Sequence, residues 1–209
     1  MRAIADTDVN VRTAVIKTMN AITHRESTLI APLLAEIMPK LLEQTVIVPE
    51  LVRVMDLGAF KHTVDDGLDC RKAAFECVNT VLDSCSGLVN APHIVSTLPS
   101  GLGDHYDVKM LVHAILMKLS QGVAPNSTDA VLASLEHMCA PLEKTLTARM
   151  KRDAVQQEID RNEDLLRSAL RAIRSIEQHR SSADVAAFKT LMTDVVKANE
   201  NLAALYENL

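Results

Sequence analysis

Apolar residues recur every three or four positions through most of this chain, and this spacing predicts helices. The clearest case spans residues 29–42. Its apolar face consists of Leu29, Ile30, Leu33, Leu34, Ile37, Met38, Leu41 and Leu42. The preceding helix is predicted to bury the face Val11, Ala14, Val15, Met19 and Ile22. A single amphipathic helix cannot cover its own apolar face, so these helices must pack in pairs or stacks.

The composition agrees with a helical core. Hydrophobic residues make up 48% of the 209 residues, whereas aromatic residues make up 2% and tryptophan is absent. A core built from Leu, Val, Ala, Ile and Met suits packed helices better than a sandwich or a barrel. The 6 glycines and 7 prolines are too few for an all-β fold with many turns.

Three predicted helices open in a similar way, with a polar residue, an apolar residue and a cation. These openings are Asn10-Val11-Arg12, Asp69-Cys70-Arg71 and Asp107-Val108-Lys109, and Leu165-Leu166-Arg167 is a looser fourth case. The cations of the second and third openings lie 38 residues apart, which is close to the period of HEAT-type helical hairpins. We therefore expect an all-α fold, a HEAT-type α-solenoid of about four helical hairpins in one array over residues 1–209.

One segment breaks the helical rhythm. Residues 47–66 are rich in β-branched residues around Gly58, which predicts an inserted, projecting β-hairpin. If Leu57 and Gly58 form the turn, Met55 lies opposite Phe60 and Val54 opposite Lys61. A longer loop with a bulge, a surface loop, or a short helix starting at Pro49 are alternatives. A two-stranded ribbon is marginal in water, so it must rest on something or bind something.

No catalytic constellation is present. The sequence lacks GxxxxGK[ST], GxSxG and HExxH. His105 and His113 would lie about 12 Å apart on a helix, too far to share a metal directly. The carboxylates of Asp65, Asp66 and Asp69 are explained as groups at a helix start. We expect no enzymatic activity, no cofactor and no metal.

Charge and hydropathy exclude two classes of partner. The net charge of −5 disfavours a phosphate-binding surface, and no uninterrupted apolar run approaches a membrane span. We therefore expect neither nucleic acid nor membrane as a partner.

Cys70, Cys77 and Cys85 are spaced about 10–12 Å apart along one predicted helix, too far to form a disulfide. Buried, reduced thiols in an intracellular protein are favoured.

The run GAFKHTVDDGLDCRKAAFECVNTVLDSC resembles the C-terminal end of the cullin-associated, neddylation-dissociated protein family, also described as TATA-binding-protein-interacting. The segments DVNVRTAVIKTMNAITH, LLAEIMPKLLEQT, GDHYDVKMLVHAILMKLS and NENLAALYENL are similar to further parts of that family. One departure is Ala59, where the family is expected to have proline.

The resemblance implies a non-enzymatic regulator of cullin-RING ubiquitin ligases. The alternative is a generic helical-repeat scaffold or a module that interacts with a transcription factor, TATA-binding protein. A hairpin projecting from the C-terminal repeats would bind the cullin N-terminal domain and compete with adaptor and substrate-receptor modules, which promotes receptor exchange. The implied contact residues are Val54, Met55, Asp56, Leu57, Gly58, Ala59, Phe60, Lys61 and His62. Further implied partners are the RING subunit, a separate N-terminal half of the same factor, and TATA-binding protein. The implied location is cytoplasmic and nuclear.

Overall fold

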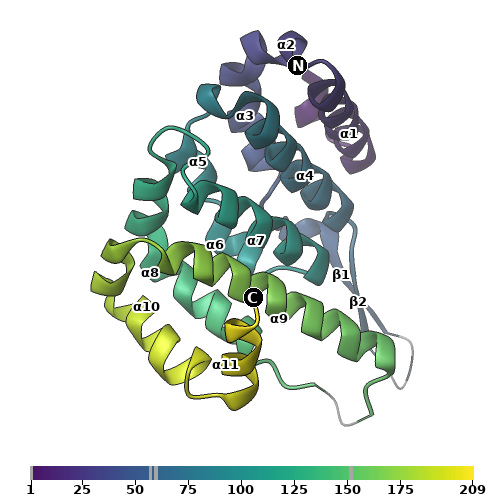
Figure 1. The fold of residues 1–209 in the computed structure, drawn as a ribbon. Coiled ribbons are helices and arrows are strands. Elements are labelled where there is room, and N and C mark those ends of the chain that lie inside the picture. Colours follow the sequence, from purple (N-terminus) through teal and green to yellow (C-terminus); the bar gives the residue numbers. More distant parts are fainter. Residues whose placement is uncertain (1, 57, 59–60, 151–152) are drawn as a thin grey trace. The chain divides into compact units, whose positions relative to one another are not determined.

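The computed structural model describes residues 2–56, 58, 61–150 and 153–209 (Figure 1). The chain divides into two compact units, Met1–Val89 and Asn90–Leu209. Helices account for most of the described residues, and the strands among them form one two-stranded antiparallel sheet. The prediction of an all-α fold with a small inserted β-hairpin is confirmed. The prediction of one HEAT array over the whole chain stays a prediction.

The first unit contains the hairpin. Its elements are η1 (Arg2–Ala5), α1 (Val9–Arg25), α2 (Ser27–Ile30), η2 (Ala31–Leu33), α3 (Leu34–Glu43), η3 (Pro49–Leu51), β1 (Val52–Asp56), β2 (Lys61–Asp65), α4 (Leu68–Cys85) and η4 (Ser86–Leu88). Asp8 caps α1, because its carboxylate accepts the Asn10 N–H at 2.8 Å. Pro49 does begin a helical turn, but this 3₁₀ turn ends at Leu51 and the chain continues as a strand.

Helix α4 forms the centre of the first unit and packs mainly on α1 (Figure 1). Its fully buried side chains include Phe75, Val78 and Leu82, each 0% exposed. Cys70, Cys77 and Cys85 are buried on the same helix, and together with Cys139 they are free thiols, as predicted. Burial raises the pKa of the Cys77 thiol to about 12, which suits a packing role rather than a reactive one.

The buried face of α1 differs from the predicted one. Its fully buried residues are Ile16 and Thr23, whereas Val11 in the predicted apolar stripe is 38% exposed. Of the other predicted residues, Ala14 is exposed and Val15, Met19 and Ile22 are half-buried, so the covered face overlaps the predicted one only in part. Packing against α4 depends on which helices are neighbours, and this is not encoded in the spacing of one helix.

Helices are the regular elements in the described part of the second unit. Its elements are α5 (Ala91–Val95), α6 (Leu98–Leu102), α7 (Tyr106–Ser120), α8 (Ser127–Leu146), α9 (Gln156–Glu177), η5 (Arg180–Asp184), α10 (Ala186–Thr190), the π-helical η6 (Leu191–Val196) and α11 (Glu200–Glu207). Helix α9 lies along α7, and its second half supplies Ala169, Leu170 and Ile173 to the core. The first two turns of α9 are exposed, in agreement with their polar sequence.

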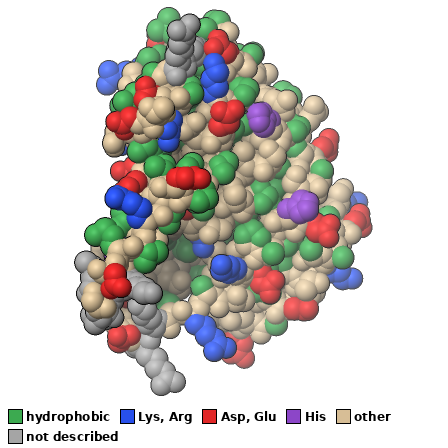
Figure 2. Space-filling view, turned by 180° about the vertical axis from the view of Figure 1, so that it is seen from behind, with side chains coloured by type: hydrophobic (Ala, Val, Ile, Leu, Met, Phe, Trp, Pro, Cys, Tyr) green, Lys and Arg blue, Asp and Glu red, His purple; other side chains and the backbone are tan. Residues whose placement is uncertain are grey.

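The face shown in Figure 2 carries mixed charge. Figure 2 shows acidic and basic side chains interspersed with apolar ones on the face that it presents. Among the described residues, no helix is both long and apolar enough to cross a membrane.

Candidate functional site

The candidate site is the hairpin formed by β1 and β2. The strands pair antiparallel, with Val54 opposite Thr63, Met55 opposite His62 and Asp56 opposite Lys61. The predicted register with a two-residue turn is therefore wrong, because four residues, 57–60, connect the strands. Leu57-Gly58 could not close the hairpin as a primed turn, since only Gly58 tolerates positive φ cheaply. The register shifts by two positions, an even number, so each residue keeps its predicted face.

The connecting segment is described only at Gly58. Gly58 has φ +79°, the left-handed conformation that favours glycine, and its N–H donates to the Asp56 carboxylate at 3.0 Å. The predicted contact residues Leu57, Ala59 and Phe60 lie outside the described residues, as does the side chain of Lys61. The described part of the predicted site is thus Val54, Met55, Asp56, Gly58 and His62, with the backbone of Lys61.

Both faces of the hairpin carry exposed apolar groups. Val54 is 65% exposed on one face, and Met55 is 44% exposed on the other, opposite the exposed His62. The two strands contact each other far more than either contacts any helix. Two exposed apolar side chains on opposite faces of a narrow ribbon suit insertion into a partner's pocket better than adhesion to a flat surface.

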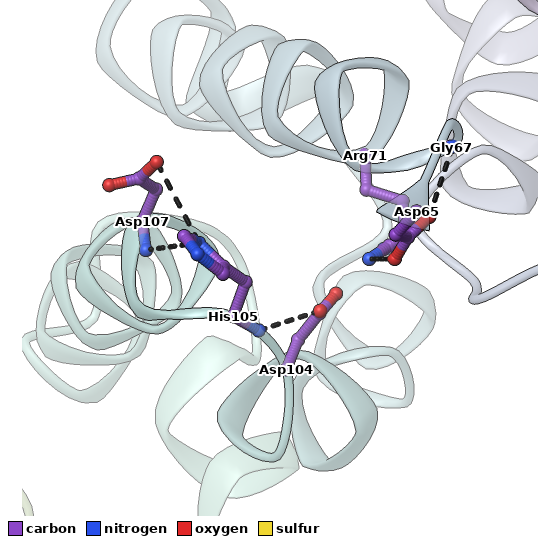
Figure 3. A network of polar contacts seen from close by, with 6 residues as sticks. All are labelled: Asp65, Gly67, Arg71, Asp104, His105 and Asp107. Atoms are coloured by element: carbon purple, nitrogen blue, oxygen red, sulfur yellow. Dashed lines mark hydrogen bonds and ion pairs between the residues drawn. The ribbon is translucent and has the colours of Figure 1, made fainter. Parts of the chain in front are cut away.

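A buried ion pair anchors the base of this ribbon. Arg71, in the first turns of α4, points its guanidinium at the Asp65 carboxylate at the end of β2 (Figure 3). Nη2 lies 2.7 Å from Oδ2, and Nη1 lies 3.2 Å from Oδ1, which is bidentate geometry. The side chain of Arg71 is 2% exposed and that of Asp65 23%. Hydrogen bonding to Arg71 lowers the pKa of Asp65, so the carboxylate is ionised at neutral pH.

Backbone contacts complete the anchor. The Asp66 N–H donates to the Leu51 carbonyl, and the Gly67 N–H donates to the Asp65 carboxylate, both at 3.0 Å. A Cβ on Gly67 would lie 3.2 Å from Arg71 Nη1 and 3.2 Å from Leu51 Cδ1. A side chain at residue 67 would therefore crowd Arg71 and Leu51, and glycine avoids this crowding. An exposed pair, Arg53 Nη2 to Asp66 Oδ2 at 2.6 Å, lies beside the buried one.

The carboxylates at the base lie beside a cleft and face arginines. A cleft beside the hairpin is lined by Val9, Leu51, Asp65, Asp66 and Asp69, among others. Asp65 and Asp66 are engaged by arginines. Within the described part of the chain, no three His, Cys, Asp or Glu residues are placed to hold a metal ion.

Comparison with known proteins identifies the family of this chain. The sequence profile of a family described as "TATA-binding protein interacting (TIP20)" matches residues 29–200, which include the whole hairpin and its anchor. The chain belongs to this family.

The relatives in this family share one kind of name. Cullin-associated NEDD8-dissociated protein 1 of Arabidopsis thaliana is 50% identical over 93% of the chain, and protein 2 of Rattus norvegicus is 38% identical over 100%. A protein of Emericella nidulans named as the C-terminal part of Cullin-associated NEDD8-dissociated protein 1 is 31% identical over 84%. The chain spans 16% of the length of each of these relatives. The predicted family is thereby confirmed, and the matched region is the C-terminal part of the longer proteins.

The anchor was not predicted from the sequence as a unit. The sequence pattern explains Asp65 as a carboxylate at a helix start and Arg71 as the cation of a helix opening. The available signal was the helix face that Arg71 shares with Ala74 and Val78. An arginine on such an apolar face requires a carboxylate partner. Asp65, six residues earlier, is the partner found.

Proposed function

We propose that this chain is the cullin-binding part of a non-enzymatic regulator of cullin-RING ubiquitin ligases. In this proposal the hairpin β1–β2 enters the pocket of the cullin N-terminal domain that adaptor proteins otherwise occupy. Occupation of that pocket displaces the adaptor with its substrate receptor and so promotes receptor exchange. The observation that carries the proposal is a ribbon exposed on both faces and held at its base by the buried Asp65–Arg71 pair. The names of the relatives supply the class of partner.

The dimensions of the hairpin suit a wedge. Strands of five residues extend about 17 Å, which is long enough to reach into a pocket but too short to form a complete interface. A stable protein interface buries about 800 Å² on each partner. The helical surfaces of the chain, or other regions of the longer relatives, must therefore contribute the remaining contact area.

The anchored base has an energetic consequence. A ribbon held in one orientation before binding loses less conformational entropy when the partner covers it. Full burial of a valine or methionine side chain contributes about 1.5–3 kcal/mol. Since Val54 and Met55 are 65% and 44% exposed, covering both would contribute about 2–3 kcal/mol in total.

The experiment compares two double variants in binding to a panel of purified cullin N-terminal domains. Val54→Asp with Met55→Asp places charge on both faces of the ribbon, and we expect the Kd to rise about 30-fold or more, because about 2 kcal/mol of contact is lost. The matched control is Val155→Asp with Ile159→Asp, since these residues are 60% and 41% exposed in the second unit. The control should bind like the unchanged chain. Equal losses in both variants would refute a role of the hairpin.

Competition is tested in the same assay by adding adaptor. If the hairpin occupies the adaptor site, a rising adaptor concentration raises the apparent Kd in proportion. Binding that is indifferent to adaptor would contradict displacement while leaving cullin binding intact. We further propose that the RING subunit is present in the complex, and that a separate N-terminal half tightens it through effective concentration. Fluorescent tagging should place the chain in both cytoplasm and nucleus.

A second candidate function is binding to TATA-binding protein. It rests on the description of the family, "TATA-binding protein interacting". The same hairpin variants separate the two functions when they are tested against purified TATA-binding protein. Binding that is retained in Val54→Asp with Met55→Asp would place that partner on another surface.

A further inference from the structure

A groove in the second unit is separate from the hairpin and has no part in the proposed function. It encloses about 300 Å³ and lies among the end of α9, the 3₁₀ turn η5, α10 and η6. This volume is at the lower end of the range for ligand pockets in proteins.

The groove has an apolar floor and a wall held by hydrogen bonds. Phe188 and Met192 line it and are 2% and 5% exposed. On one side, His179 Nε2 donates to the Ser120 carbonyl at 2.6 Å, and the buried Ser182 hydroxyl donates to the His179 carbonyl at 2.7 Å. These bonds tie η5 to the end of α7. The groove is therefore preorganised and does not need a ligand to form.

The opposite wall is a π-helical turn. The Lys197 N–H donates to the Met192 carbonyl at 2.9 Å, five residues earlier. This turn places Lys189, Met192 and Lys197 on the groove. Such turns are rare and frequently occur at functional sites.

The rim is basic although the chain is acidic overall. Arg180, Lys189 and Lys197 line the groove together with one carboxylate, that of Glu177. Glu177 is already engaged, since it accepts the Tyr206 hydroxyl at 2.5 Å and lies 3.9 Å from Lys197. Among the residues that the structure describes, Arg180 and Lys189 make no ion pair. The groove thus combines uncompensated positive charge with an apolar floor, in a chain with a net charge of −5.

We propose that this groove binds a short acidic peptide segment of a partner protein. An apolar side chain of the peptide would rest on Phe188 and Met192, and flanking carboxylates would lie near Arg180 and Lys189. The apolar floor favours a peptide over a phosphate or a nucleic acid, because phosphate sites present convergent N–H donors instead. The electrostatic contribution should also speed association at low salt.

The test uses the full chain with methyl-labelled methionines and nuclear magnetic resonance. The Met192 methyl group on the floor reports binding, and its resonance is assigned with Met192→Leu. The buried Met38 of the first unit is the internal reference. The probe is the acetylated, amidated hexapeptide EELFED, and the comparison peptide is KKLFKK. We expect a saturable shift of the Met192 methyl resonance at millimolar EELFED, no shift of the Met38 resonance, and no response to KKLFKK.

Charge reversal provides the second arm. Arg180→Glu with Lys189→Glu should raise the Kd for EELFED by about tenfold or more. The matched control, Arg161→Glu with Arg171→Glu on the exposed side of α9, should leave the Kd unchanged. No Met192 shift at millimolar EELFED, an equal response to both peptides, or equal losses in both double variants would overturn the proposal. It would also be overturned if oligothymidylate or phosphatidylserine vesicles engaged Arg180 and Lys189 while EELFED did not. None of these outcomes bears on cullin binding by the hairpin.

Discussion

Loss of the Asp65 carboxylate should loosen the hairpin at its base. In Asp65→Asn the side chain keeps an oxygen for the Gly67 N–H, but Arg71 loses the negative charge of Asp65 while remaining 2% exposed. Removal of one partner from a fully buried ion pair costs about 3–5 kcal/mol. Because Asp65 is 23% exposed, water can reach the vacated side of the arginine. We therefore expect a loss of about 2–3 kcal/mol in the free energy of unfolding of the first unit.

The neighbouring pair supplies the control. Asp66→Asn makes the same chemical change one residue away, in the pair with Arg53, whose side chains are 62% and 36% exposed. An exposed pair contributes about 0–1 kcal/mol, so this variant should lose less than 1 kcal/mol. The two variants differ chiefly in the burial of the arginine that loses its partner.

Hydrogen exchange measured by mass spectrometry resolves the effect within the first unit. Peptides that cover β1, β2 and the start of α4 should exchange faster in Asp65→Asn. In Asp66→Asn the exchange of the same peptides should change little, and peptides of α8 should be unaffected in both variants. A double-mutant cycle with Arg71→Met should give a coupling of about 1–3 kcal/mol. Equal losses in the two asparagine variants, or a coupling near zero, would refute the argument from burial.

The pH dependence gives an independent reading of the same pair. The pKa of Asp65 is lowered in the folded chain from its ordinary value of 3.8. A lowered carboxylate pKa contributes stability that is present above 3.8 and is lost as the pH falls through the folded value. The acid limb of the stability curve should therefore be shallower in Asp65→Asn than in the unchanged chain.

Two further predictions concern a buried histidine and the hairpin connection. Burial first, and then the charge of Lys109, lower the pKa of His113 from 6.5 to about 4. Since the unfolded chain takes up the proton at a higher pH than the folded chain, the free energy of unfolding should fall by about 3 kcal/mol as the pH drops from 6.5 to 4. Urea unfolding at several pH values measures this fall. The fall should be smaller in His113→Gln and unchanged in the exposed control His137→Gln. In the connection, Gly58→Val should cost about 1–2 kcal/mol of local stability, because φ at this position is +79°. The control is Gly87→Val, at an open position with no positive φ, which should not change hydrogen exchange in β1 and β2. Equal exchange in both variants would contradict the role of backbone strain.

Much of this protein could be predicted from residue spacing alone. Apolar residues at three- and four-residue intervals predicted the helices, because side chains at that spacing share one face of a helix. The cluster of β-branched residues around Gly58 predicted the hairpin, since no helical face runs through it. The run from Gly58 to Cys85 indicated the family that the comparisons confirm.

Other features depended on the tertiary structure. The sequence left the strand register open, and the structure shows a four-residue connection, with Asp65 at the end of β2 paired to Arg71 on α4. The buried face of α1 was decided by its neighbour, so Ile16 is covered while Val11 remains exposed. Periodicity is a property of one segment, whereas burial and ion pairing are properties of two segments brought together. The spacing of residues therefore determined which elements form, and the packing between elements determined which side chains are buried and which pairs anchor the hairpin.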